Sequence, residues 1–180
     1  MKKIHSGLLL LAMFLMAGCA GMGTSLTDDI SIEVEADPRT NFAGYKTYMW
    51  LGASAIVNDP FGQWEPPAFD ADAEIKFLID QELRARDMTE TSATPDLLIG
   101  FAAGIDMTNV EYKENPNTRF KSLESVPKGA LVILMVDART GVLIWAASAQ
   151  GDVQGNTGEA AKKRLKFAVK GMLDRFPGKK

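Results

Sequence analysis

Residues 129–150 read GALVILMVDARTGVLIWAASAQ, in which two apolar runs flank a short polar segment. The first run, Gly129 to Val136, is rich in residues that favour strands, and the second, Val142 to Gln150, has a similar length. Asp137 to Gly141 supplies a turn, because Gly141 can take the positive φ that a bulged hairpin turn requires. The stretch therefore predicts an antiparallel β-hairpin.

Further strands are predicted upstream of this hairpin. Residues 30–35 alternate apolar and polar side chains, the pattern of a half-buried strand. Residues 45–51 are rich in aromatic and other strand-favouring side chains, so these two segments could pair as an antiparallel hairpin. Residues 96–103 are apolar on both faces, which favours a central strand, and residues 105–112 indicate a weaker edge strand.

Two helices complete the predicted fold. The first runs from Asp70, a suitable N-cap, to about Arg86, with apolar residues at helical spacing. The second begins near Thr157 and ends before Pro177, with an almost unbroken apolar stripe. The element order predicts an α+β fold, a two-layer sandwich with both helices packed on one face of a mostly antiparallel sheet of about five to six strands.

Two long segments are predicted as loops, residues 52–69 and 113–128. The first contains several prolines and three aromatic residues that a merely solvated loop does not need. Its rings either fold back on the core as a lid, which we favour, or form a recognition surface. Tyr48 and Trp50 share one strand face, which could hold an apolar or sugar-like ligand only if that face is open. The candidate binding surface comprises Phe61, Trp64, Tyr48 and Trp50.

The first eighteen residues have the features of a secretory signal. Lys2 and Lys3 precede an apolar run that is too short to span a bilayer. Gly18 and Cys19 then mark the expected cleavage site and the residue that follows it. The segment resembles the bacterial lipobox, in which the cysteine is acylated, so we expect cleavage after Gly18 and lipid attachment at Cys19. The alternative is an ordinary signal peptide with an incidental cysteine.

The resulting organisation is a signal peptide over residues 1–18, a flexible tether over 19–27 and a single domain over 28–180. Two or more acyl chains anchor a protein stably to a membrane. Ala20, in the position after the cysteine, indicates the outer membrane, so we expect the domain to face the periplasm from its inner leaflet. The membrane is thus one predicted partner, and an unidentified envelope protein is another.

Composition excludes several classes of function. Without Lys2 and Lys3, 18 basic residues face 23 acidic ones, a net charge of about −5, which is unfavourable for nucleic-acid binding. His5, the single histidine, lies in the signal, and Cys19 is the single cysteine. The mature chain therefore lacks Ser-His-Asp and Cys-His catalysis and histidine-ligated zinc. The acidic clusters lack the loop of a calcium site, so we expect no catalytic residue, no metal and no cofactor.

Several short motifs extend across most of the mature chain. They are Asn41-Phe42 with Tyr45, Thr47, Tyr48 and Trp50; Pro95-Asp96-Leu97; Asp137, Thr140-Gly141, Leu143 and Trp145; and Phe176-Pro177. In this order and spacing the chain resembles a family of bacterial lipoproteins described as domain of unknown function 4136. It departs from the family at Arg86-Asp87-Met88, in place of a Lys-Gly-aromatic step. The resemblance implies the fold and an envelope location, and it brings no known reaction.

Three functions remain open from the sequence. The first is a non-enzymatic lipoprotein that acts as a binding or structural module in the periplasm. The second is a carrier or sensor of a small apolar ligand or lipid, which predicts an apolar pocket of at least a few hundred Å³ between sheet and helices. The third, which we rank last, is a carboxylate-only hydrolase using Asp96 and Asp137, residues that are better explained by strand ends and turns.

Overall fold

The computed structural model describes residues 26–114, 119, 121–153 and 158–178. Its strands are β1 (Ser31–Ala36), β2 (Thr47–Asn58), β3 (Thr89–Glu90), β4 (Leu97–Asp106), β5 (Val110–Glu114), β6 (Lys121–Ser125), β7 (Lys128–Asp137) and β8 (Leu143–Asp152). Its helices are α1 (Ala71–Arg84) and α2 (Glu159–Leu173), with a short 3-10 turn, η1 (Phe42–Gly44), between β1 and β2. The predicted signal peptide and most of the tether lie outside the described residues.

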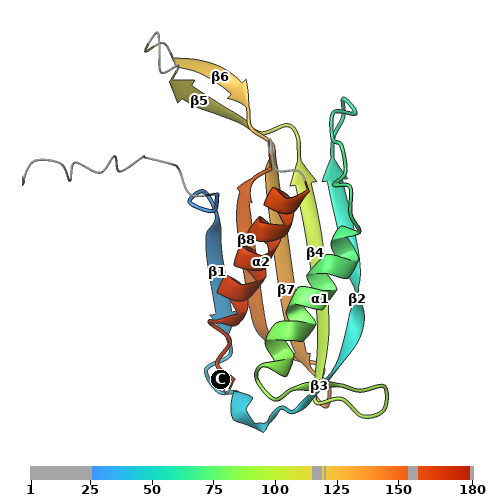
Figure 1. The fold of residues 1–180 in the computed structure, drawn as a ribbon. Coiled ribbons are helices and arrows are strands. Elements are labelled where there is room, and N and C mark those ends of the chain that lie inside the picture. The colour runs from blue at the N-terminus through green and yellow to red at the C-terminus, as the bar shows by residue number, and fades with distance from the viewer. Residues whose placement is uncertain (1–25, 115–118, 120, 154–157, 179–180) are drawn as a thin grey trace, which may run out of the picture.

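The predicted α+β class and the placement of the helices are confirmed, as Figure 1 shows: both helices cover one face of an open sheet. The six strands of this sheet lie in the order β1-β8-β7-β4-β2-β3. The pairs β1–β8, β8–β7 and β7–β4 are antiparallel, whereas β2 runs parallel to both β4 and β3. The sheet is therefore mixed, and three of its five pairings are antiparallel, in line with the mostly antiparallel sheet that we predicted.

The predicted pairing of residues 30–35 with 45–51 is wrong. β1 pairs with β8 at one edge, and β2 pairs with β4 near the other. Parallel strands need a crossover, and α1 supplies it by returning the chain between β2 and β4. β2 is followed in the chain by α1 and then by β4. This strand–helix–strand connection determines the partner of β2 more strongly than the short distance in sequence between β1 and β2 does.

The predicted hairpin of residues 129–150 is confirmed as β7 and β8, which pair antiparallel from Lys128–Asp152 to Val136–Leu143. Gly141 has a φ of 70°, and its N–H donates to the carbonyl of Asp137 at 2.8 Å. The pairing register shifts between Met135 and Val136, which is the bulge expected beside this turn. Local turn chemistry thus fixes the register of this hairpin.

The helices begin and end close to the predicted positions. The carboxylate of Asp70 accepts the N–H of Ala73 at 3.0 Å and caps α1. Thr157, the predicted start of the second helix, lies outside the described residues. The apolar stripes of both helices meet the sheet, where Tyr48, Ile79, Ile99 and Trp145 are almost fully buried. No helix among the described residues is long and apolar enough to cross a membrane.

Two predicted loops contain strands. β2 continues to Asn58, so the loop after it begins only at Asp59. β5 and β6 pair with each other as a separate two-stranded sheet, where the sequence predicted an edge strand and then a loop. Their many charged residues disfavour a strand prediction, and their pairing depends on cross-strand contacts that a single segment does not reveal. Figure 1 shows this hairpin projecting beyond one end of the main sheet.

Candidate functional site

A cavity of about 330 Å³ lies between the helices and the sheet. It lies where β2, β4 and β8 end and β7 begins, because Asn58 pairs with Asp106, Asp106 with Lys128 and Lys128 with Asp152. Its side chains are mostly aliphatic or aromatic, with a few polar groups contributed by several elements. Ligand pockets in proteins are typically this size or larger and are lined mainly by apolar side chains. The pocket is therefore the candidate functional site.

The pocket exists because the side chains that face the helices become smaller along the sheet. One row across the strands contains Trp50, Ile99, Met135 and Trp145, which fill the space below the helices. Two rows further along, the corresponding residues are Ala55, Ala103, Leu131 and Ala149. All four line the cavity. Three of them are alanines, so the helices cannot close on this part of the sheet.

The segment between β2 and α1 covers part of the pocket. Trp64, Pro66, Pro67 and Phe69 line it from this side. The carboxylate of Asp59 accepts the backbone N–H of Trp64 at 2.6 Å, and this hydrogen bond fixes the start of the segment that covers the pocket. The ammonium group of Lys162 on α2 lies 5.3 Å from the centre of the Phe69 ring, a cation–π contact. This agrees with the lid interpretation that we favoured for this segment.

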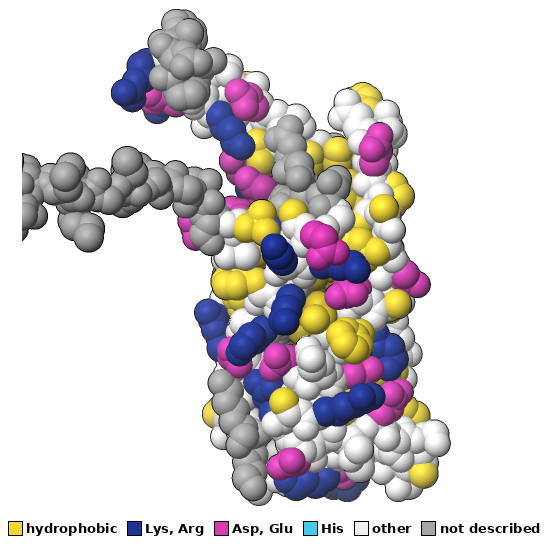
Figure 2. All heavy atoms as spheres, in the orientation of Figure 1, with side chains coloured by type: hydrophobic (Ala, Val, Ile, Leu, Met, Phe, Trp, Pro, Cys, Tyr) yellow, Lys and Arg dark blue, Asp and Glu magenta, His cyan; other side chains and the backbone are white. Residues whose placement is uncertain are grey.

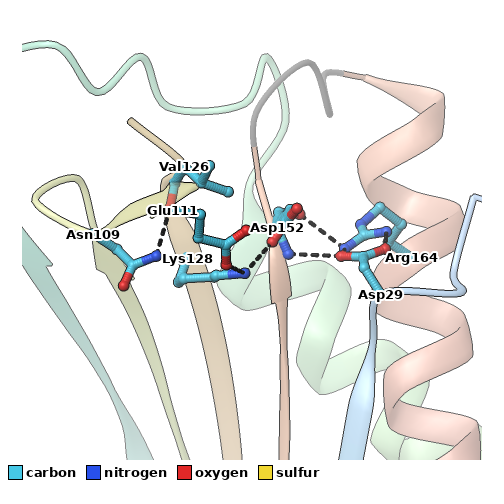
Figure 3. Close-up of polar contacts among 7 residues, drawn as sticks. All are labelled: Asp29, Asn109, Glu111, Val126, Lys128, Asp152 and Arg164. Atoms are coloured by element: carbon cyan, nitrogen blue, oxygen red, sulfur yellow. Dashed lines mark hydrogen bonds and ion pairs between the residues drawn. The ribbon is translucent and has the colours of Figure 1, made fainter. Parts of the chain in front are cut away.

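Arg164 lines the pocket and is paired with Asp29 beside it. The guanidinium of Arg164 donates to both carboxylate oxygens of Asp29 at 2.6 Å and to the carbonyl of Asp152 at 2.8 Å. It also donates to the carbonyl of Leu26. This hydrogen-bonded pair lowers the pKa of Asp29 to about 2. The pair joins the start of the described chain to α2 at the pocket rim (Figure 3).

Gly151 on β8 permits this arrangement. A Cβ atom at that position would lie 2.7 Å from a guanidinium nitrogen of Arg164 and 2.9 Å from a carboxylate oxygen of Asp29. Both distances are shorter than real contacts, so any larger residue would displace the pair.

The polar network continues from Asp152 to the β5–β6 hairpin. The ammonium group of Lys128 lies 2.5 Å from a carboxylate oxygen of Asp152 and 2.7 Å from one of Glu111. The hydrogen bonds to these two carboxylates raise the pKa of Lys128. The side-chain amide of Asn109 donates to the carbonyl of Val126 at 3.2 Å (Figure 3). These contacts hold the base of the hairpin beside the pocket.

The four candidate residues do not form one surface, so that prediction is wrong. Tyr48 is fully buried, and its hydroxyl donates to Asp80 on α1 at 2.7 Å. Trp50 donates to the same carboxylate at 3.2 Å and is half-buried. Both side chains connect the sheet to a helix, and neither lines the pocket. Trp64 lines it, whereas Phe61 points outward with 79% of its surface exposed.

Asp96 and Asp137 lie at the opposite end of the sheet from the pocket and have structural partners. Asp96 accepts the backbone N–H groups of Lys46 and Thr47 at 2.8 and 2.9 Å, and these bonds lower its pKa. Asp137 accepts the hydroxyl of Tyr45 at 2.8 Å, which lowers the pKa of Asp137; burial, with this hydrogen bond, raises that of Tyr45 to about 12. Turn and strand-end roles account for both carboxylates.

The remaining predicted sites are not described by the structure. Gly18 and Cys19 lie outside the described residues, so cleavage and lipid attachment stay predictions. Within the described part of the chain, no group of three or more histidine, cysteine, aspartate or glutamate side chains is arranged to hold a metal ion.

Sequence reasoning missed the pocket floor. Its residues are largely alanines and glycines on different strands, and no single segment marks them as a site. The available signal was the decrease in side-chain size along 97, 99, 101 and 103 of β4, from Leu, Ile and Phe to Ala. This decrease indicates a cavity only when the neighbouring strands also carry small residues at the same level of the sheet.

The structure is similar to those of several known proteins. A DUF4136 family protein from Bacteroides thetaiotaomicron is 16% identical over 83% of this chain and 97% of its own, with a TM-score of 0.54. A PDZ domain protein from Parabacteroides distasonis is 15% identical over 84% of this chain, with a TM-score of 0.48, and the match spans only 37% of that protein. A PelC dodecamer from Paraburkholderia phytofirmans is 15% identical over 78% of this chain and 94% of its own, with a TM-score of 0.42.

In sequence, no curated protein matches the chain. A family model described as "Domain of unknown function (DUF4136)" matches residues 32–178, which include both helices and the strands that form the pocket.

Proposed function

The chain belongs to the DUF4136 family, and we propose that it is a lipid-anchored protein of the bacterial envelope that binds a small apolar ligand and catalyses no reaction. The apolar pocket carries this proposal. Its volume of about 330 Å³ lies at the lower end of the range of small-molecule pockets, roughly 300 to 1,000 Å³.

The lining indicates the class of ligand. At about 30 Å³ for each water-sized group, the pocket holds about ten such groups, which suits a medium-length acyl chain or a flat apolar molecule. Alanine methyls and the Trp64 and Phe69 rings offer dispersion contacts without directional hydrogen bonds. The charge of Arg164, the one cationic residue in the described lining, is taken up by Asp29, and the rest of the lining is mostly apolar, so an uncharged body fits the pocket best.

The envelope location is supported by the N-terminal sequence. The lipobox-like segment ends at Cys19, and two or more acyl chains there would hold the domain at a membrane. Ala20 favours the outer membrane, with the domain in the periplasm. The lack of histidine and of a free thiol in the mature chain supports a binding role over catalysis.

Native mass spectrometry of the full chain, purified from bacterial membranes, tests the proposal. We expect the acylated chain to carry one extra small apolar molecule. Ala103→Phe fills the pocket from β4 and should remove that molecule. Ala102→Phe is the matched control, since the neighbouring residue points to the other face of the sheet and should leave it bound. A wild-type chain that carries nothing and takes up no added fatty acid would refute ligand binding.

A further inference from the structure

The end of the molecule that bears the pocket also gathers exposed apolar side chains. Among the described residues, seven of the thirteen exposed large hydrophobic residues lie at this end. Six of them form what we term the tether-end surface: Ile56, Val57, Phe61, Val110, Tyr112 and Leu123, which are between 53% and 79% exposed. The seventh, Leu26, is the first described residue. Figure 2 shows hydrophobic side chains along β2 and at the tip that follows it.

The β5–β6 hairpin contributes half of this surface. Tyr112 pairs directly with Leu123, and Val110 lies two residues from Tyr112 on the same face. The other face carries Glu111, Lys113 and Glu124, and Glu111 is held by Lys128 on the main sheet. The hairpin is therefore amphipathic over Val110, Tyr112 and Leu123, with Glu114 and Lys121 on the same face near the turn, and this face points away from the domain. An isolated two-stranded sheet is marginally stable in water, so an apolar environment on that face would stabilise it.

The position of the tether limits which end can face the membrane. Leu26 is bonded to Arg164 at the pocket rim, and only six residues separate it from Cys19. A fully extended chain from Cys19 to Leu26 reaches about 25 Å. The ten residues of β7 span about 30 Å from this end of the sheet to the other. If Cys19 is embedded in a bilayer, the end of the sheet that bears the pocket therefore stays within about 25 Å of it, less than the length of β7.

We propose that the tether-end surface docks onto the lipid bilayer, with Phe61, Tyr112 and Leu123 entering the interface between headgroups and acyl chains. Aromatic side chains favour this region of a membrane because their rings are apolar and a hydroxyl can stay hydrated. The charges of the hairpin are of both signs, so the docking is apolar and needs no anionic lipid. The inference rests on the proposed attachment at Cys19, and it places the pocket beside the bilayer.

Depth-dependent fluorescence quenching tests this orientation. The full acylated chain is reconstituted into vesicles of phosphatidylethanolamine and phosphatidylglycerol that contain spin-labelled lipid. The thiol of Cys19 is occupied by lipid, so a cysteine introduced as Ser125→Cys, beside Leu123, takes a fluorescent label alone. Val142→Cys, at the opposite end and 50% exposed, is the matched control. We expect lipid quenching of the label at residue 125 and none at residue 142.

A second variant separates docking from anchoring. Combining Tyr112→Ser with Leu123→Ser should abolish the quenching at residue 125, while the chain still floats with the vesicles and unfolds at the same temperature. If labelled Ser125→Cys, with Tyr112 and Leu123 intact, floats without quenching, or is quenched no more than labelled Val142→Cys, the docking alone is overturned. A chain that does not float overturns docking and lipid attachment together. Native mass spectrometry decides ligand binding independently of both results.

Discussion

Asp29 joins the beginning of the domain to α2, and its effect on stability depends on pH. The hydrogen bonds from Arg164 lower its folded-state pKa to about 2, from an ordinary value of 3.8. A lowered pKa means that the folded state favours the charged carboxylate. The stabilisation is therefore fully present above about pH 4 and is lost as the pH falls toward about 2.

Asp29→Asn should lower the free energy of unfolding at neutral pH by about 1 kcal/mol, a modest value because the pair is partly exposed to solvent. Urea unfolding of both proteins across the acid range measures this difference. We expect it to shrink between pH 3.8 and about 2, because the wild-type carboxylate then becomes protonated. A difference that is the same at both ends of this range would show that Asp29 acts through its shape and not its charge.

Asp80 is the residue that connects β2 with α1. It is buried and accepts the Tyr48 hydroxyl at 2.7 Å, the Trp50 indole N–H at 3.2 Å and the Lys76 ammonium group at 2.8 Å. Asp80→Ala leaves the hydroxyl of a fully buried tyrosine without its acceptor. We expect a loss of about 2 kcal/mol in the free energy of unfolding, measured with urea.

The control for Asp80→Ala is Gln81→Ala, an exposed neighbour on the same helix, which should change stability by less than about 0.5 kcal/mol. Equal effects of the two substitutions would contradict the role of Asp80. The burial of Tyr48 could not be read from its strand alone, because the alternating pattern left open whether its face was covered.

At the scale of elements, α1 ends in a motif that favours glycine. The N–H of Met88 donates to the carbonyl of Leu83 at 3.1 Å, and that of Asp87 to the carbonyl of Arg84 at 3.0 Å, which is the Schellman pattern. Asp87 therefore has a φ of 60°, in the left-handed region. This is the position at which the family resemblance led us to expect glycine.

Asp87→Gly should raise the free energy of unfolding by about 1 kcal/mol, because glycine adopts a positive φ without steric cost. Asp87→Ala should instead lower it, since alanine keeps the Cβ and lacks the local hydrogen bonding that lets aspartate tolerate this conformation. Thermal unfolding of both variants checks the order. A glycine variant that is less stable than the wild type would contradict this account of the helix end.

The elements differ in how far the sequence predicts them. The β7–β8 hairpin was predictable, because Asp137 and Gly141 encode their own turn. The pairing of β1 with β8 was not, because the two strands are more than 100 residues apart and their patterns suit several partners. The β5–β6 hairpin was missed because alternating charges obscure its one apolar face.

At the scale of the whole molecule, the two ends of the main sheet differ in how they are packed. The end with Tyr45, Thr47, Asp96 and Asp137 is closed by hydrogen bonds between strand ends. Phe176 closes the same end, with its ring centre 5.6 Å from that of Trp145. The other end has alanines in place of large side chains, a lid and an exposed apolar hairpin. One segment, such as β4 with its decreasing side-chain size, shows this division only in part, because each row of side chains draws on four strands.

Ligand binding in the pocket is the claim on which the function depends, and titration with a fluorescent fatty acid tests it most directly. The full chain is placed in vesicles without detergent, which would itself occupy an apolar cavity. The structure predicts saturable binding at one site, weakened at least about tenfold by Ala103→Phe, or about 1.4 kcal/mol, and unchanged by Ala102→Phe. Binding that is absent from the wild type, or equal in all three proteins, would contradict it.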